Sequence, residues 1–274
     1  MTEQILLEVQ KVSRSFGKFQ ALSNVSLKIQ PSQLCALIGP NGAGKTTFYN
    51  VISGRYRSTS GRVFFEGRDI TRAPAHRLVG MGLLRSFQIT NIFPALTVLE
   101  NVLVPLVVHH GNSFSCLGAI EKRQDLAEEA EQILSRVGLT GQSHRVVSTL
   151  AYGDKRLIEI AIVLARRPRL VLLDEPTLHL DLGAQVELLQ QLRALARSHG
   201  YTIVVVTHEL NLAAEFADQV ALLHRGKCLR SGTPADVYQR ELLEQVFGAS
   251  LEVETRPSGR PHVSLLGRRE DFHV

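Results

Sequence analysis

A single loop constrains this chain more than any other feature: residues 39–47, with the sequence GPNGAGKTT. An apolar run at residues 34–38 leads into the loop, and residues 46–52 form a helical pattern that stops at Gly54. A strand, a glycine-rich loop and a helix in this order predict a backbone nest that faces a phosphate group. Glycine-rich turns occur in many folds, but this spacing with these flanks favours nucleotide binding.

Each residue type in the loop suits one part of a nucleotide. Lys45 should reach the β- and γ-phosphates, and the Thr46 hydroxyl should hold Mg²⁺. Thr47 is a candidate contact of the α-phosphate. The remaining phosphate contacts are expected from the backbone of the loop, at Gly39, Asn41, Gly42, Ala43 and Gly44. These expectations concern phosphate binding alone, which kinases, GTPases and ATPases share.

An acidic pair follows a second apolar run, at residues 170–173. Such a run is typical of a buried parallel strand, and ligands bind at the carboxyl ends of strands in open α/β sheets. We expect Asp174 to bind Mg²⁺ and Glu175 to polarise the attacking water as a general base. An acidic pair can also simply end a strand, but the apolar run before it and Pro176 after it favour the catalytic interpretation.

Two further residues are candidates for sensing the γ-phosphate. His208 follows the apolar run at residues 202–206, the next predicted strand after Glu175, where an imidazole can hydrogen-bond a phosphate oxygen. A lone histidine at a strand end is often structural, and its place after Glu175 is what favours a role in the site. Gln88 lies 43 residues after Lys45 and could ligate Mg²⁺ or orient water.

The base of the nucleotide has one candidate contact. Phe16 lies 29 residues before Lys45 and could stack on adenine, although packing in the core is a comparable alternative. A guanine-reading segment of the type Asn-Lys-x-Asp is absent from the sequence. The sequence therefore favours ATP over GTP.

Bulk properties exclude several other classes of protein. The chain has 274 residues, 44% of them hydrophobic, and its longest apolar stretch, Val102–Val108, is far shorter than the roughly 20 residues that span a bilayer. The N-terminus shows no signal-peptide pattern, so we expect a cytosolic protein. The net charge of +5 comes from scattered basic residues and favours a solvated surface over nucleic-acid binding. The three cysteines, Cys35, Cys116 and Cys228, do not have the spacing of metal ligands. We therefore predict that they are reduced thiols that pack in the fold.

The order of these motifs resembles the ATP-binding subunit of ABC transporters over about residues 6–235. The discriminating segment is 150–154, with the sequence LAYGD, where the family has Leu-Ser-Gly-Gly-Gln. Only Leu150 and Gly153 match that pattern. A helix predicted over residues 154–166 follows, and its N-terminus can direct N–H groups at a γ-phosphate held by a partner subunit. The resemblance implies a backbone contact at Gly153, whereas Ala151 lacks a hydroxyl whose bond to phosphate is worth about 1.5–3 kcal/mol.

The same resemblance implies an assembly. Two ATP molecules would be bound between two subunits, identical or related, arranged head to tail, with Asp181 in the loop that crosses the interface. Transmembrane permease subunits and a solute-binding protein would complete the complex at the cytoplasmic face of the inner membrane. A groove near Gln88, Ile92, Phe93 and Pro94 would receive a segment of the permease, unless Ile92 and Phe93 pack inward. Nucleic acid is not an expected partner.

The expected fold is α/β, a P-loop NTPase of the ABC type with a mostly parallel core sheet, an N-terminal antiparallel β part and an inserted helical subdomain. The ATPase core is assigned to residues 1–90 and 167–240, and the helical subdomain that carries the signature to residues 91–166. The clearest helix of that subdomain is predicted over residues 121–137. Residues 241–274 form a C-terminal extension, with a helix at 241–248 and a hairpin at 251–266.

Cues for the transported substrate conflict. Residues 80–88, 93–103 and 150–153 resemble the importer branch that handles branched-chain and other amino acids, amides or urea. The C-terminal extension instead resembles the tail of ATPases that serve iron-chelate or haem importers. We give more weight to the stretches near the motifs, because tails are exchanged more easily between proteins.

Three other classes of function are weaker alternatives. ABC-type ATPases of DNA repair or chromosome structure carry a long coiled-coil insertion, but here Lys45 and Asp174 are only 129 residues apart. A soluble P-loop kinase would have no use for the signature or for His208. A subunit that binds ATP without hydrolysing it is disfavoured because both Glu175 and His208 are present.

Overall fold

The computed structural model describes residues 4–86, 92–110 and 124–266. An antiparallel sheet of order β2-β1-β4-β5 is built from the N-terminal part of the chain. Its strands are β1 (Leu7–Phe16), β2 (Phe19–Ile29), β4 (Ser60–Phe65) and β5 (Arg68–Asp69). Side chains on one face of β1, such as Leu7 and Val9, are buried beneath this sheet. This is the predicted N-terminal antiparallel part of the fold.

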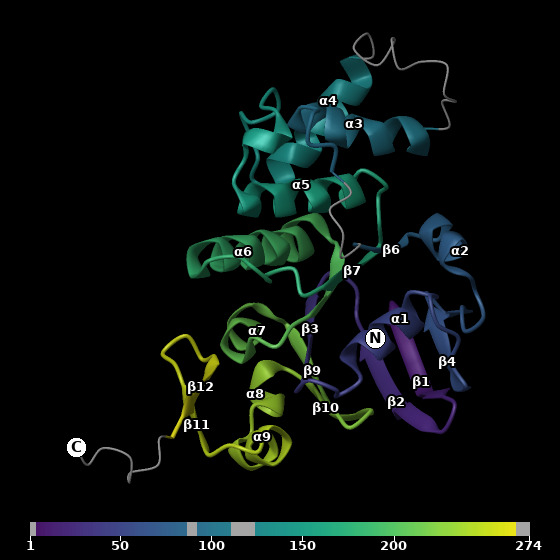
Figure 1. Ribbon diagram of the computed structural model, residues 1–274, viewed down its shortest axis with the longest axis vertical. Coiled ribbons are helices and arrows are strands. Elements are labelled where there is room, and N and C mark those ends of the chain that lie inside the picture. The colour runs from purple at the N-terminus through teal and green to yellow at the C-terminus, as the bar shows by residue number, and fades with distance from the viewer. Residues whose placement is uncertain (1–3, 87–91, 111–123, 267–274) are drawn as a thin grey trace.

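A second sheet has the order β10-β9-β3-β8-β7-β6 and forms the core of the molecule (Figure 1). Its strands are β3 (Leu34–Ile38), β6 (Leu83–Arg85), β7 (Leu170–Asp174), β8 (Thr202–Val206), β9 (Gln219–His224) and β10 (Lys227–Gly232). All neighbouring pairs are parallel except β9 with β10. Every residue of β3 and β8 is buried, as their apolar sequences predict. The carboxyl ends of β3, β7 and β8 therefore meet at one edge of the sheet.

Helices cover both faces of the core sheet. Helix α1 (Lys45–Ile52) packs between the two sheets, where Phe48 and Ile52 join a buried cluster with residues of β2, β4 and β7. Helix α6 (Leu182–His199) covers the opposite face and buries Leu188 and Leu192 in a second cluster. Helix α2 (Ala75–Gly80) precedes β6, and helix α7 (Leu210–Phe216) follows β8.

Three helices lie together above α6 in Figure 1: α3 (Val98–His109), α4 (Gln124–Arg136) and α5 (Tyr152–Leu164). A capping box between Thr97 and Glu100 begins α3. The predicted apolar stripe of α4 is buried, at Leu126, Ala130, Ile133 and Leu134. Helix α5 overlaps the signature helix predicted over residues 154–166, but it begins and ends two residues earlier. It begins earlier because Ala151 already has the extended backbone of an N-cap residue.

The chain continues into α8 (Pro234–Val237), α9 (Arg240–Phe247) and a hairpin of β11 (Leu251–Thr255) and β12 (Pro261–Leu265). Asn211 of α7 fastens the hairpin, because its side chain donates to the Val263 carbonyl at 2.9 Å and accepts from the Val263 N–H at 2.8 Å. The domain boundaries at residues 90, 166 and 240 stay predictions. Within the described ranges, none of the helices has the length and apolar character needed to cross a bilayer.

Both cysteines of the described part of the chain are shielded from solvent to some degree. Cys35 is buried in β3 and Cys228 is half-buried in β10. Burial raises the pKa of the Cys35 thiol to about 12 and that of the Cys228 thiol to about 11. Both thiols are therefore protonated at neutral pH. Cys116 lies outside the described residues.

Candidate nucleotide-binding site

The loop between β3 and α1 has the conformation that its glycines allow. Gly39, Gly42 and Gly44 have φ angles of 146°, 76° and 100°. A Cβ atom at Gly39 would collide with the carbonyl oxygen of Leu223, and one at Gly44 would lie 2.9 Å from the carbonyl oxygen of Ala21. The first N–H groups of α1, which have no intrahelical acceptors, begin where this loop ends. The loop thus combines close packing below with backbone donors at a helix N-terminus.

Lys45 is the first residue of α1 and is only 7% exposed. Its Nζ donates to the carbonyl oxygens of Gly39 at 2.6 Å and Pro40 at 3.1 Å, so the side chain lies across the loop. Burial lowers the pKa of Lys45, and the carboxylates of Glu175 and Asp174 oppose that shift. The lysine is therefore next to the predicted acidic pair as well as the loop. In the same first turn, Thr46 is exposed and Thr47 is half-buried.

The acidic pair lies at the end of β7. Burial raises the pKa of Asp174, the adjacent Glu175 raises it further, and Lys45 lowers it. Glu175 has a left-handed backbone with φ of 46°, and its N–H donates to the Val206 carbonyl of β8 at 2.9 Å. A non-glycine residue in this region carries backbone strain, which is common at functional sites. The hydrogen bond to β8 therefore fixes the backbone position from which the Glu175 side chain extends.

His208 contacts Glu175 of the acidic pair from the end of the neighbouring strand. Its Nδ1 atom lies 3.5 Å from Oε1 of Glu175, and its Nε2 atom lies 3.3 Å from Oε1 of Glu209. The side chain is 48% exposed, so it is available to a ligand. The structure thus brings together Lys45, Asp174, Glu175 and His208 from three strand ends, as the sequence predicts. Gln88 lies outside the described residues.

Gly153 and Asp181 lie at the starts of two neighbouring helices. Gly153 is in the first turn of α5, where a Cβ would be 3.5 Å from the Cβ of Ala184 in α6. Asp181 is the N-cap of α6, and its carboxylate accepts from the Ala184 N–H at 2.9 Å. Ala151, the N-cap of α5, makes no side-chain cap bond. The first turn of α5 therefore lies against the first turn of α6. A helix N-terminus also leaves N–H groups without intrahelical acceptors.

Three side chains of α5 that are joined by hydrogen bonds line a cavity together with the acidic pair. Arg156 donates to the Tyr152 hydroxyl at 2.8 Å and to Glu159 at 2.8 Å. Burial raises the pKa of Glu159, and Arg156 opposes that shift. A cavity of about 360 Å³ is lined by these three residues together with Asp174 and Glu175. Sequence reasoning missed this group of side chains, although the i, i+4 spacing of Tyr152 and Arg156 was a signal.

Phe16 is not part of the hydrophobic core. It is 40% exposed at the end of β1, with its ring 5.4 Å from the ring of Tyr56 in an edge-to-face arrangement. The Arg14 guanidinium lies 4.4 Å from the Phe16 ring centroid. Of the two interpretations of Phe16, core packing is therefore wrong. An exposed ring remains available for stacking.

The structure has an apolar groove at a different place from the groove that the sequence predicted. A cavity of about 460 Å³ lies between α2, β6, α3 and α5, and its lining includes Ala75, Val79, Pro105 and Val163. The predicted groove residues Ile92, Phe93 and Pro94 do not line it. Ile92 packs against the helical cluster, as one alternative expected, whereas Phe93 is 51% exposed.

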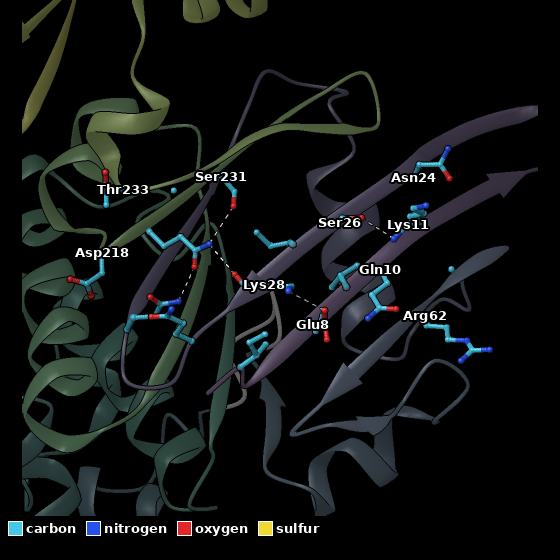
Figure 2. Close-up of a pocket in the computed structure, with 18 of the residues that line it drawn as sticks. Glu8, Gln10, Lys11, Asn24, Ser26, Lys28, Arg62, Asp218, Ser231 and Thr233 are labelled. Carbon is cyan, nitrogen blue, oxygen red and sulfur yellow. Dashed lines mark hydrogen bonds and ion pairs between the residues drawn. The ribbon is translucent and has the colours of Figure 1, made fainter. Parts of the chain in front are cut away.

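A larger cavity, about 1200 Å³, opens on the outer face of the antiparallel sheet beside β9 and β10 (Figure 2). Most of the side chains that line it are polar, and they include Lys11, Ser26, Lys28, Arg62 and Gln219. No predicted site residue belongs to this lining. It is separate from the group around Lys45.

A glycine cradle with a buried lysine, an acidic pair and a histidine at parallel strand ends defines a P-loop nucleotide-binding protein. The sequence profile described as "ABC transporter" matches residues 22–178. The chain belongs to the ABC transporter family. Within that family it is an ATP-binding subunit that hydrolyses ATP.

Relatives match along most of the chain. The branched-chain amino acid transport ATP-binding protein BraF of Pseudomonas aeruginosa is 33% identical over 239 residues, which cover 85% of this chain and 93% of BraF. LivG of Escherichia coli K12, with the same described role, is 32% identical over 241 residues and is covered to 94%. The Fe(3+) ions import ATP-binding protein FbpC of Rhizobium etli is 37% identical over 231 residues, but only 62% of its length is covered.

Solved structures support the same fold. The ADP conformation of an ATP-binding cassette from an ABC transporter superposes with a TM-score of 0.76 at 26% identity, covering 89% of this chain and 97% of that one. A dimeric bacterial ABC transporter cassette has a TM-score of 0.68 at 28% identity, covering 83% of this chain and 98% of its own.

Proposed function

We propose that this subunit drives an importer of branched-chain or other amino acids, amides or urea. The observation that carries the proposal is coverage: the chain spans 93% of BraF and 94% of LivG, but 62% of FbpC. The three stretches near the motifs resemble the same importer branch. Import of iron is the second candidate, because FbpC has the highest identity of these three relatives and the C-terminal hairpin resembles iron-chelate and haem systems.

The cradle binds the phosphates of ATP. Backbone N–H groups of the loop at residues 39–47, apart from Pro40, which has none, surround the β-phosphate. Lys45 turns from the carbonyls of Gly39 and Pro40 toward the β- and γ-phosphates. Asp174 and the exposed Thr46 hydroxyl are oxygen donors of the kind that Mg²⁺ prefers, and Gln88 could add a third. Mg²⁺ would neutralise part of the charge on the phosphates. Phe16 stacks on the adenine ring.

Hydrolysis depends on two residues, Glu175 and His208, that follow the carboxyl ends of β7 and β8. Glu175 accepts a proton from the attacking water as general base, and His208 hydrogen-bonds the γ-phosphate. The 3.5 Å separation of His208 and Glu175 supports this division of roles, because both can face one phosphate group. Their backbone positions are set by adjacent parallel strands, which keeps the two groups in fixed relation.

A second subunit completes each site. The N-termini of α5 and α6, with Gly153 and Asp181, form one face that would close over the ATP held by the partner. The partner is a second copy of this chain or a related ATPase subunit. ATP binds the closed pair more tightly than the open one, so binding favours closure and hydrolysis reverses it.

Transport itself belongs to permease subunits in the membrane, with a solute-binding protein in the same complex. We place the ATPase at the cytoplasmic face of the inner membrane. The apolar groove between α2, β6, α3 and α5 is the docking site for a permease segment, because it offers about 460 Å³ with a mostly apolar lining beside the helices that carry the signature.

The replacement Glu175→Gln tests the ATPase mechanism. We expect it to keep ATP affinity, to lower hydrolysis at least about 100-fold because the general base is lost, and to accumulate a dimer with ATP. Gel filtration and phosphate release measure these effects. Glu187→Gln, on the exposed surface of α6, is the matched control. A Glu175→Gln variant that stays monomeric or hydrolyses ATP at the normal rate contradicts the assignment.

Uptake assays separate the two substrates. Cells whose only copy of the chain carries Glu175→Gln should lose uptake of labelled leucine and retain uptake of ferric ion. Loss of ferric uptake with normal leucine uptake would reverse the choice between the two importers.

A further inference from the structure

One arginine fastens the aromatic residues at the end of β1. The Arg14 guanidinium carbon lies 4.4 Å from the ring centroid of Phe16 and 5.6 Å from that of Tyr56. The two rings are 5.4 Å apart and inclined by 80°. A guanidinium within about 6 Å of a ring centroid is attracted by the electrons of the ring face. Arg14 therefore covers one face of Phe16 and braces Tyr56 at the same time.

Hydrogen bonding alone does not explain this arginine conformation. Its Nη1 atom donates to the Arg57 carbonyl at 2.9 Å. Its Nε atom is buried without a hydrogen-bond partner among the described residues. A fully exposed arginine would satisfy that donor with water. The contacts with the two rings therefore stabilise this half-buried guanidinium group in place of a hydrogen bond from its Nε atom.

The cluster adjoins the phosphate cradle. On the paired strands Phe16 lies opposite Phe19, and Arg14 lies opposite Leu22. Leu22 in turn contacts the cradle, because its side chain would be 3.0 Å from a Cβ at Gly44. Arg14 and Phe16 are therefore on the strand next to the one against which the cradle packs. A nucleotide whose phosphates fill the cradle can place its base at this end of β1.

We propose that Arg14 is a positioning residue for the base of ATP. It holds Phe16 in place from one side, so that the exposed side of the ring receives adenine. A cation on one face of an aromatic ring draws electron density toward itself, which strengthens stacking of an electron-rich purine on the other face. The inference rests on the proposed function of Phe16 and assigns to Arg14 a role that acts only through the base.

Arg14→Met tests the inference, because methionine keeps an unbranched apolar side chain and removes the charge. We expect the Kd for ATP to rise about 2- to 5-fold, the change that corresponds to one partly exposed cation–π contact. The Kd for inorganic tripolyphosphate, which has no base, should not change. In steady-state assays KM for ATP should rise while kcat at saturating ATP stays the same.

A double-mutant cycle with Phe16→Ala adds a readout that a general structural role would not produce. Once the ring is absent, Arg14→Met should have no further effect on the Kd for ATP. Arg62→Met, on the exposed side of β4 at the polar groove of Figure 2, is the matched control and should leave every value unchanged. Arg14→Lys, which keeps a cation, should restore part of the affinity.

Several results would overturn the inference. They are an unchanged Kd for ATP in Arg14→Met, an equal loss for ATP and tripolyphosphate, or additive effects of Arg14→Met and Phe16→Ala. If Arg14→Met does not fold, as judged by circular dichroism, the same measurements on Arg14→Lys decide, with a smaller rise in Kd expected for ATP alone. A wild-type chain that does not bind ATP would instead contradict the proposed function, so the two failures are distinguishable.

Discussion

At the scale of single residues, the surroundings of Asp174 disfavour its ionised form. Burial and the adjacent Glu175 raise its pKa, and Lys45 offsets only part of that shift. In the protein without ligands, ionisation of this carboxyl group therefore carries a free-energy cost. A divalent cation would relieve that cost, because it favours the ionised form.

This arrangement predicts the pH dependence of stability without ligands. Because the folded-state pKa of Asp174 is raised above its unfolded value, the folded state binds the proton more tightly. The free energy of unfolding should therefore rise as the pH falls through the folded pKa, and level off below the unfolded one. Asp174→Asn should be more stable than the wild type at pH 8, with a difference that shrinks on acidification. Urea unfolding at several pH values measures it.

Asp69 provides a control of opposite sign. Hydrogen bonds from Thr71 lower the pKa of its exposed carboxyl group. Its contribution is present above the unfolded pKa and is lost as the pH falls through the folded one. Asp69→Asn should therefore be less stable than the wild type at pH 8. If Asp174→Asn behaves in the same way, burial of Asp174 is not what sets its pKa.

At the scale of elements, helix α6 begins at a residue for which we propose two roles. Asp181 caps the helix by accepting a hydrogen bond from the Ala184 N–H, and in the proposed function it lies at the subunit interface. A carboxylate at a helix N-terminus stabilises the helix whether or not a partner is bound. Stability and turnover therefore need separate variants to be told apart.

Two replacements at this position separate the tasks. Asp181→Ala should lower the free energy of unfolding by about 1 kcal/mol, whereas Asp181→Asn should keep most of it, because asparagine is also a good N-cap. Both should lower the ATPase rate if the carboxylate acts at the interface. Thr233→Ala, which removes the capping box of α8, is a control that loses stability alone. Full ATPase activity in Asp181→Asn would show that capping is the whole role.

The sequence predicted the elements that position the site better than the contacts between them. The core strands β3, β7 and β8 were predictable because each contains an apolar run of at least four residues that leads into a polar motif. The two-residue error at the start of α5 arose because helix boundaries depend on backbone angles at the cap, which residue type only biases. The sheet pairing confirmed that the phosphate loop, Glu175 and His208 share one edge.

Contacts that join distant elements were not predictable. The apolar groove is lined by residues from 53 to 166 on several elements, and periodicity shows which face of each is apolar but not where a gap is left between them. Likewise, the contact of Phe16 with Tyr56 joins β1 to the segment after α1. A single sequence contains no signal for such pairs.

At the scale of the whole molecule, the apolar groove and the larger, more polar cavity lie on different elements. The apolar groove adjoins the helices α3 and α5, whereas the polar groove of Figure 2 borders the antiparallel sheet. Their linings suggest different occupants. An apolar lining loses little solvation when it is covered by an apolar helix, and a polar lining keeps its water.

A charge in the apolar groove should therefore disconnect the subunit from the membrane. We expect Ala75→Glu, at an exposed position of α2 in that groove, to lower co-sedimentation with permease-containing vesicles at least about tenfold, because one uncompensated buried charge costs several kcal/mol. ATP affinity of the isolated subunit should not change. Ser26→Glu in the polar groove is the control. Normal sedimentation of Ala75→Glu would exclude this groove as the docking site.

The strand order also dictates when the cradle can exist. Strand β3, which ends at residue 38, has β8 and β9 as its flanking partners, and β8 does not begin until residue 202. During translation the phosphate-binding loop is therefore synthesised long before β8 or β9. Until β8 and β9 are synthesised, neither edge of β3 has its strand partner. We therefore expect that the nascent chain does not yet bind a triphosphate. The ability to bind nucleotide should therefore arise late in synthesis, although the phosphate-binding loop is synthesised early.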